Sequence, residues 1–133
     1  MTLRYLTLLS IFFTGLNVMA QSTSIDPRLK VRFSQEQLSD MQANAPSRLA
    51  FWTYYLDHSY SIVDIPSEKA EALTSLEVME IPSSQFNGFS ILLDEHQKHG
   101  ATFRFKGEDK MLVIKPMEQF INEFNAYYQS NKK

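Results

Sequence analysis

The sequence contains no cysteine and only four glycines among its 133 residues. A chain without cysteine forms no disulfide bond and has no thiol nucleophile, so a hydrophobic core alone has to hold the fold. Basic residues are not in excess either, because 13 Lys and Arg stand against 15 Asp and Glu. Nucleic-acid binding is therefore not expected, since it depends on clustered positive charge.

The sequence also lacks the usual cofactor and catalytic motifs. It has no phosphate-binding Gly-x-x-x-x-Gly-Lys-Ser/Thr loop and no dinucleotide-binding Gly-x-Gly-x-x-Gly turn. The stretch from Gly88 to Ser90 begins like a nucleophile elbow, but Leu92 occupies the place of the second glycine. We therefore expect no cofactor, and Ser90 is a poor candidate for a catalytic nucleophile.

The clearest apolar run is at the start of the chain. Arg4 precedes a largely apolar stretch, and Val18 and Ala20 are small or short residues at the positions read by signal peptidase. As a helix, residues 5–20 would be about 24 Å long, which is short for a hydrocarbon core of about 30 Å. The pattern predicts a secretory signal peptide over residues 1–20, cleaved after Ala20. A retained N-terminal anchor and a buried first helix are the alternatives.

Two further absences bear on the localisation of the protein. No Asn-x-Ser/Thr glycosylation site occurs, and no cysteine follows the apolar run to accept a bacterial lipid anchor. Together with the export signal, these features predict a bacterial precursor whose product is periplasmic or secreted. After signal cleavage no stable membrane insertion is expected.

The next part of the chain predicts a polar segment followed by two helices. Residues 21–33 are interpreted as a flexible N-terminal segment. Ser34 and Gln37 form a capping-box pattern that begins a helix, and Pro46 ends it. Residues 47–59 predict a second helix, whose apolar arc is broad enough to pack on two sides.

The remainder predicts strands and one more helix. Strands are expected at 60–65 and 76–81, separated by a short helix at 67–74. Residues 102–106 and 111–115 predict a β-hairpin around a Gly-containing turn. The final helix opens at Pro116, and its apolar residues fall on one helical stripe: Met117, Phe120, Ile121, Phe124 and Tyr128.

These elements predict an α+β fold. We expect a small, mostly antiparallel sheet of about four strands, packed by the two N-terminal helices and the C-terminal amphipathic helix. No internal repeat or linker is visible, so residues 34–133 are interpreted as a single domain.

Four aromatic residues close together in sequence are candidates for ligand binding: Trp52, Tyr54, Tyr55 and Tyr60. Aromatic rings with a polar edge suit sugar or peptide platforms. The same residues on a helix with a broad apolar arc also suit a core, and this alternative stays open.

The densest group of metal-ligand residue types is Asp94, His96 and His99. On a helix the two histidines would lie three residues apart on one side, within reach of one ion. Lys98 lies within the same stretch, which also has the composition of a solvated turn before Gly100.

The sequence therefore favours a small exported, non-catalytic binding or interaction module in the cell envelope or outside, with a protein or small ligand as its partner. One alternative is a small hydrolase-like or metal-dependent enzyme that uses His96 and His99. Another is a membrane-tethered accessory factor that retains residues 5–20.

Overall fold

The computed structural model describes residues 24–91 and 96–132. Two α-helices, α2 (Gln35–Asn44) and α3 (Pro46–His58), follow a short 3-10 helix, η1 (Pro27–Val31). Strands β1 (Tyr60–Asp64), β2 (Glu77–Met79), β3 (Ala101–Phe105) and β4 (Lys110–Ile114) come next, and α4 (Met117–Asn131) ends the fold. Two further 3-10 turns flank β2, namely η2 (Ser67–Lys69) and η3 (Ser83–Gln85). The predicted α+β class is confirmed. The predicted signal peptide, residues 1–20, lies outside the described residues.

The four strands form one mixed sheet in the order β1-β4-β3-β2. β4 pairs antiparallel with β3, which confirms the predicted hairpin, and also with β1. β2 pairs parallel with β3, because the chain crosses from one sheet edge to the other between β1 and β2. The sheet is therefore mostly antiparallel, with a short parallel edge strand.

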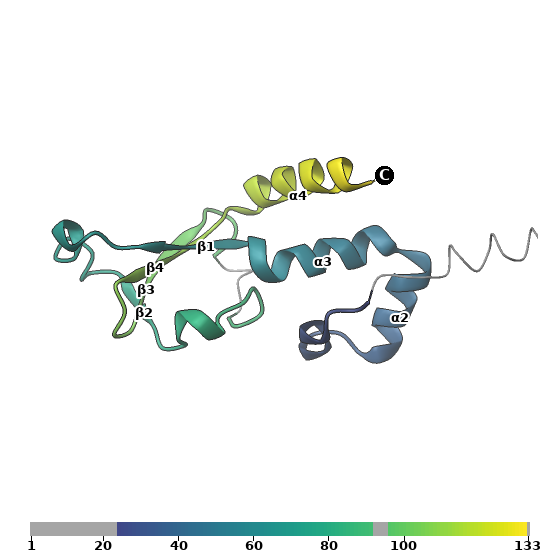
Figure 1. Cartoon of the computed structure of the whole chain (residues 1–133), viewed down its shortest axis with the longest axis horizontal. Helices are drawn as coiled ribbons and strands as arrows, with labels where there is room; N and C mark the ends of the chain where they lie inside the picture. Colours follow the sequence, from purple (N-terminus) through teal and green to yellow (C-terminus); the bar gives the residue numbers. More distant parts are fainter. Residues whose placement is uncertain (1–23, 92–95, 133) are drawn as a thin grey trace, which may run out of the picture.

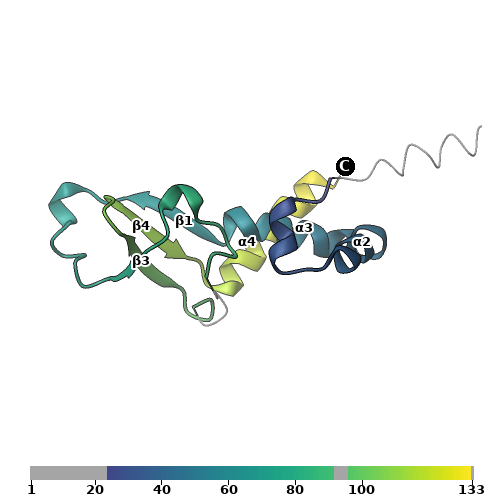
Figure 2. The same ribbon diagram turned by 90° about the horizontal axis from the view of Figure 1, so that it is seen from below.

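The helices gather at one end of the sheet instead of covering a whole face. Figure 1 shows α3 and α4 side by side beyond the end of the strands, with α2 against α3. The 90° view in Figure 2 shows the same separation of sheet and helices along the long axis. The described part of the chain contains no helix that is both long enough and apolar enough to cross a membrane.

Helix α3 belongs to two hydrophobic clusters. Its Tyr55 packs with buried residues of the sheet and of α4, while Leu49 and Leu56 pack with η1 and α2. Trp52 contacts both clusters. The broad apolar arc of residues 47–59 therefore has the two-sided packing that its sequence predicts.

A capping box begins α2, and a glycine allows one loop to approach α3 closely. Ser34 Oγ accepts from Gln37 N at 3.1 Å, and Gln37 Oε1 accepts from Ser34 N at 2.9 Å, so the capping box is confirmed. In the loop after η3, a Cβ on Gly88 would lie 2.6 Å from the Tyr55 carbonyl oxygen. Only glycine allows this loop to approach α3 so closely, where Gly88 N donates to Leu56 O.

Three expectations differ from the structure. The helix predicted at 67–74 is a single 3-10 turn without a side-chain cap and without a buried residue to hold it. The strand predicted at 76–81 is reduced to Glu77–Met79. In the segment interpreted as flexible, residues 27–31 form η1, and Leu29 is fully buried.

Helix α4 packs on the core through four of the five residues of the predicted stripe, and the exception is Ile121. Phe120 and Phe124 are buried as expected, but the side chain of Ile121 is 39% exposed. Tyr127, seven residues after Phe120, lies on the side of the stripe nearer α3 and stacks on Tyr54. Ile121 and Tyr127 are both largely exposed and lie at the margins of the buried stripe, which also contains the partly buried Met117 and Tyr128.

Candidate functional site

The four predicted aromatic ligand residues do not form one platform. Tyr55 is buried in the core, and Trp52 is half-buried between the two clusters. Tyr60 is half-buried beside the sheet, where its hydroxyl donates to Phe86 O at 3.1 Å. Burial raises the pKa of that hydroxyl. Of the four, only Tyr54 joins a partly exposed aromatic surface.

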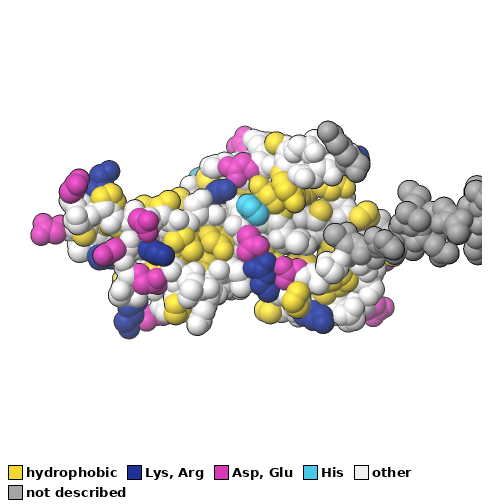
Figure 3. Space-filling model, in the orientation of Figure 1, with side chains coloured by type: hydrophobic (Ala, Val, Ile, Leu, Met, Phe, Trp, Pro, Cys, Tyr) yellow, Lys and Arg dark blue, Asp and Glu magenta, His cyan; other side chains and the backbone are white. Residues whose placement is uncertain are grey.

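That surface lies between α3 and α4. The ring of Tyr54 stacks on His58 at 4.0 Å between centroids and on Tyr127 at 4.6 Å. His58 is exposed, and the side chain of Tyr127 is 46% exposed. Figure 3 shows hydrophobic side chains along the side of α4 that faces α3. We call Tyr54, His58 and Tyr127 the aromatic stack. Tyr127 was missed because it falls just outside the predicted stripe, although its offset of seven from Phe120 indicates the same face.

The orientation of His58 is set by its own helix. Its Nδ1 lies 3.1 Å from the Tyr54 carbonyl oxygen, four residues earlier. A carbonyl only accepts, so Nδ1 carries the proton in this hydrogen bond. In the neutral ring Nε2 is then an acceptor, and no described residue hydrogen-bonds to it.

Polar groups of α4 and of the preceding linker border the aromatic stack. Lys115 Nζ lies 2.6 Å from Glu123 Oε2, and Gln119 Nε2 donates to Glu123 Oε1 at 3.0 Å. These contacts lower the pKa of Glu123, with Gln119 the largest cause, then Lys115, and with a smaller contribution from the nearby His58. An open hollow of about 430 Å³ adjoins them, lined by residues of the first turns of α4: Pro116, Glu118, Gln119, Asn122 and Glu123.

On the other side of His58, a network of charges ties η1 to α3. Arg28 makes two hydrogen bonds to the Asp57 carboxylate, at 2.7 and 2.8 Å, and an ion pair with Asp26 at 2.8 Å. The arginine lowers the pKa of both carboxyls, and Asp57 and Asp26 in turn raise the pKa of Arg28. In Figure 3 acidic and basic side chains alternate from α4 across to η1, with a histidine among them.

The lowered pKa values make a prediction about acid stability. A carboxyl whose folded pKa lies below its unfolded value of about 3.9 stabilises the fold above that pH, and the effect is lost as the pH falls through the folded pKa. We therefore expect the free energy of unfolding to fall more steeply between about pH 5 and pH 2 in the wild type than in Asp57→Asn. The difference should not exceed about 1 kcal/mol, because these side chains are exposed to solvent. Urea melts across the pH range would measure it, and parallel curves for the two proteins would contradict it.

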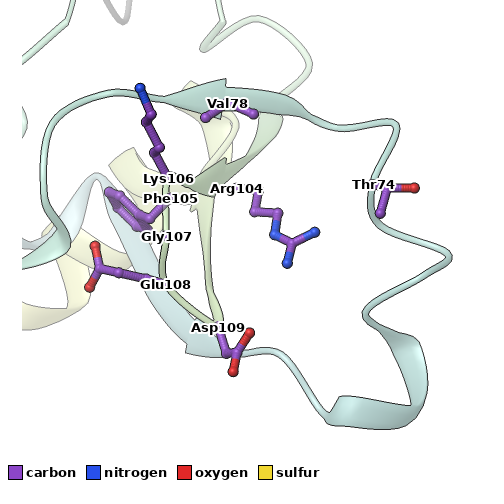
Figure 4. Close-up of a pocket in the computed structure, with 8 residues that line it drawn as sticks. All are labelled: Thr74, Val78, Arg104, Phe105, Lys106, Gly107, Glu108 and Asp109. Carbon is purple, nitrogen blue, oxygen red and sulfur yellow. The ribbon is translucent and has the colours of Figure 1, made fainter.

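A second hollow, of about 480 Å³, lies at the other end of the molecule, beside the tip of the β3–β4 hairpin. Figure 4 shows the guanidinium of Arg104 extending into it from β3, while Lys106 points away. Lys106 pairs with Glu80 at 3.1 Å, and Glu108 accepts from the Ser83 hydroxyl at 2.6 Å. This bond lowers the pKa of Glu108. Two cations, Arg104 and Lys106, and two carboxylates, Glu108 and Asp109, line this hollow, so it presents no uniform charge to a ligand.

The predicted metal ligands are only partly described. Asp94 lies outside the described residues. His96 packs edge-on against Phe103 at 5.2 Å, and His99 is exposed in the same turn. Across residues 24–91 and 96–132, no three His, Asp or Glu side chains are grouped closely enough to hold an ion.

Ser90 closes a turn instead of facing a base. Its Oγ accepts from Asn87 N at 2.8 Å, and Asn87 Oδ1 accepts from Phe89 N at 2.8 Å. This arrangement is an Asx turn, which explains the serine and asparagine structurally.

No family model, no curated protein and no solved structure matches the chain.

Proposed function

We propose that the protein is an exported, non-catalytic binding module, and that the aromatic stack with its polar border is its ligand-contact surface. The predicted signal peptide supports export to the periplasm or beyond. The observation that carries the proposal is the stacking of Tyr54 with His58 and Tyr127 on two packed helices, with exposed rings at the surface. A site built on helices holds its side chains in fixed positions, which lowers the entropic cost of binding.

The chemistry of the surface favours a sugar-containing ligand. Aromatic rings provide an apolar face for the C–H groups of a sugar ring. The border supplies acceptors and donors for hydroxyl groups, namely His58 Nε2, the Gln119 amide and the Lys115–Glu123 pair. Because polysaccharides are abundant in and around bacterial envelopes, this ligand class also agrees with the proposed localisation.

The enzyme alternative has less support from the described residues. His96 packs against an aromatic ring, His99 lies on an exposed turn, and the Ser90 hydroxyl is used within its own loop. The membrane-tethered alternative depends on residues 5–20 and stays a prediction.

Retention on insoluble polysaccharides tests the proposal. The purified full chain, incubated with cellulose, chitin or peptidoglycan, should be retained by at least one of them. Tyr127→Ala should reduce this retention about tenfold, the loss expected when roughly 1.4 kcal/mol of stacking is removed. Val31→Ala is the control, because Val31 is exposed and belongs to η1, whereas the stack is formed by α3 and α4. Equal retention of Tyr127→Ala and wild type, no retention on any polymer, or turnover of ester, phosphate or glycoside substrates would contradict the proposal.

A further inference from the structure

The two edges of the sheet differ in how they are protected. β2 has three residues, begins with the exposed Glu77, and is followed by the exposed Glu80 and by Pro82. Short length, charge and proline are the devices by which natural proteins prevent another strand from pairing at an edge. β1 has five residues, and its only charge is Asp64 at its end. It contains no proline, lysine or glycine, and its register with β4 runs without a bulge.

The register shows which backbone groups of β1 face outward. Lys115 N donates to Ser59 O, and Ile65 N donates to Asp109 O. In an antiparallel ladder such hydrogen-bonded pairs alternate along the strand, so Ser61 and Val63 also bond to β4. The N–H and C=O groups of Tyr60, Ile62 and Asp64 therefore point away from β4, and no described residue hydrogen-bonds to them through its backbone.

We propose that this open edge of β1 binds an extended peptide segment of a partner, in antiparallel pairing with Tyr60, Ile62 and Asp64. Strand addition of this kind draws its affinity from main-chain hydrogen bonds and its specificity from alternate side chains. The edge of β1 is a second binding surface, separate from the aromatic stack, and its binding of a peptide does not require the stack to bind sugar.

Charge and topology favour a peptide over a second copy of the chain. Asp64 is the one charge of β1, and Lys110 lies opposite it on β4. A peptide with a basic residue on the other side of Asp64 adds a second opposite charge, whereas antiparallel pairing with a second copy puts the uncharged Tyr60 there. β1 follows α3 after a single residue. A strand that binds to β1 and extends beyond Tyr60 therefore runs beside the last turn of α3. If a second copy paired through its own β1, the residues that follow this strand, Pro66 and η2, would have to fit beside the last turn of α3. A single extended peptide has no turn at that point.

The geometry also defines the side chains of a suitable probe. Residues opposite Tyr60 and Ile62 share the covered face of the sheet, where both side chains join the core cluster. Those opposite Ser61 and Val63 share the other face, where Val63 is 38% exposed. The peptide acetyl-Lys-Thr-Val-Thr-Val-amide places its lysine opposite Asp64, its valines on the covered face and its threonines on the other.

N-methylated peptides give a test that leaves the protein unchanged. The ¹⁵N-labelled full chain is titrated with a millimolar excess of the peptide and followed by its amide resonances. We expect saturable shifts centred on Tyr60, Ile62 and Asp64. Methylating both valine nitrogens removes donors that face β1 and should weaken binding tenfold or more. Methylating both threonine nitrogens alters groups that point away, so binding should be unchanged.

Variants of the protein provide a second test of the same binding site. Asp64→Pro and Asp64→Asn both remove the charge, but only proline removes the outward N–H, so Asp64→Pro should bind the peptide more weakly. Tyr127→Ala should bind it like the wild type, which separates this site from the aromatic stack. No saturable shift, or equal weakening by the two methylated peptides, would overturn the proposal. Shifts of the same amides with protein concentration alone would assign the edge to a second copy and overturn it as well.

Discussion

Replacing Phe120 by alanine is expected to lower the free energy of unfolding by about 3–5 kcal/mol. Phe120 is fully buried, and its ring contacts Phe51 at 5.3 Å and Tyr55 at 5.3 Å, both edge-to-face. Together with Phe124, which also contacts Phe51, it fixes α4 to α3. The cost combines lost burial of the ring with a cavity that the rigid surroundings cannot close. Urea denaturation followed by far-UV circular dichroism would measure it.

Ile121→Ala on the same helix is the matched control. Its side chain is 39% exposed, so we expect a loss of less than about 1 kcal/mol. Equal losses for Ile121→Ala and Phe120→Ala would contradict the burial of Phe120 and the exposure of Ile121 in the structure.

The second large effect is expected in the segment that the sequence presents as flexible. Leu29→Ala should destabilise the fold by about 2–5 kcal/mol, the usual cost for a fully buried leucine. The side chain of Leu29 is 0% exposed and packs with Leu38, Met41, Leu49 and Leu56. Removing it leaves a cavity among these four side chains, and the same urea melts would report the loss.

Val31→Ala, two residues away, provides the comparison. Val31 is 81% exposed, so its substitution should change the free energy of unfolding by no more than about 0.5 kcal/mol. If Leu29→Ala were equally mild, η1 would not be part of the folded core and residues 21–33 would be mobile, as their polarity suggests.

The helices and the hairpin could be predicted because their signals are local. The hydrogen bonds of Ser34 and Gln37 involve residues three apart, and Pro46 begins α3 where the preceding helix ends. The alternation of residues 101–114 specifies two strands joined by a turn, in which Gly107 has a φ of +71°. Such features depend on a few neighbouring residues, which the sequence displays directly.

The position of β2 could not be predicted in the same way. Its parallel pairing with β3 joins Val78 to Arg104, residues far apart in the sequence, after a long crossing from the other edge. Nothing within residues 76–81 encodes that partner, because strand order is decided by the whole sheet. The packing of Leu29 was missed for the same reason, since its neighbours lie on α2 and α3.

The candidate site was found only in part. Tyr54 is among the predicted residues, but Trp52 and Tyr55 point to other surroundings because consecutive helical residues are turned by about 100°. Tyr60 lies on β1 and not on the helix. His58 lies four residues after Tyr54 and could have been assigned to the same face. Tyr127 comes from another helix, and its pairing with Tyr54 requires knowledge of how α4 packs on α3.

Trp52 is the only tryptophan of the chain and touches both hydrophobic clusters, with its ring 5.5 Å from Phe33 and 5.2 Å from Tyr55. Its fluorescence therefore serves as an intrinsic reporter at the junction of the helical and sheet halves. If both halves melt as one cooperative unit, the emission and the helical signal trace a single transition. If one half opens first, the indole emission changes while part of the secondary structure persists, so one natural fluorophore suffices to show whether α3 couples the halves.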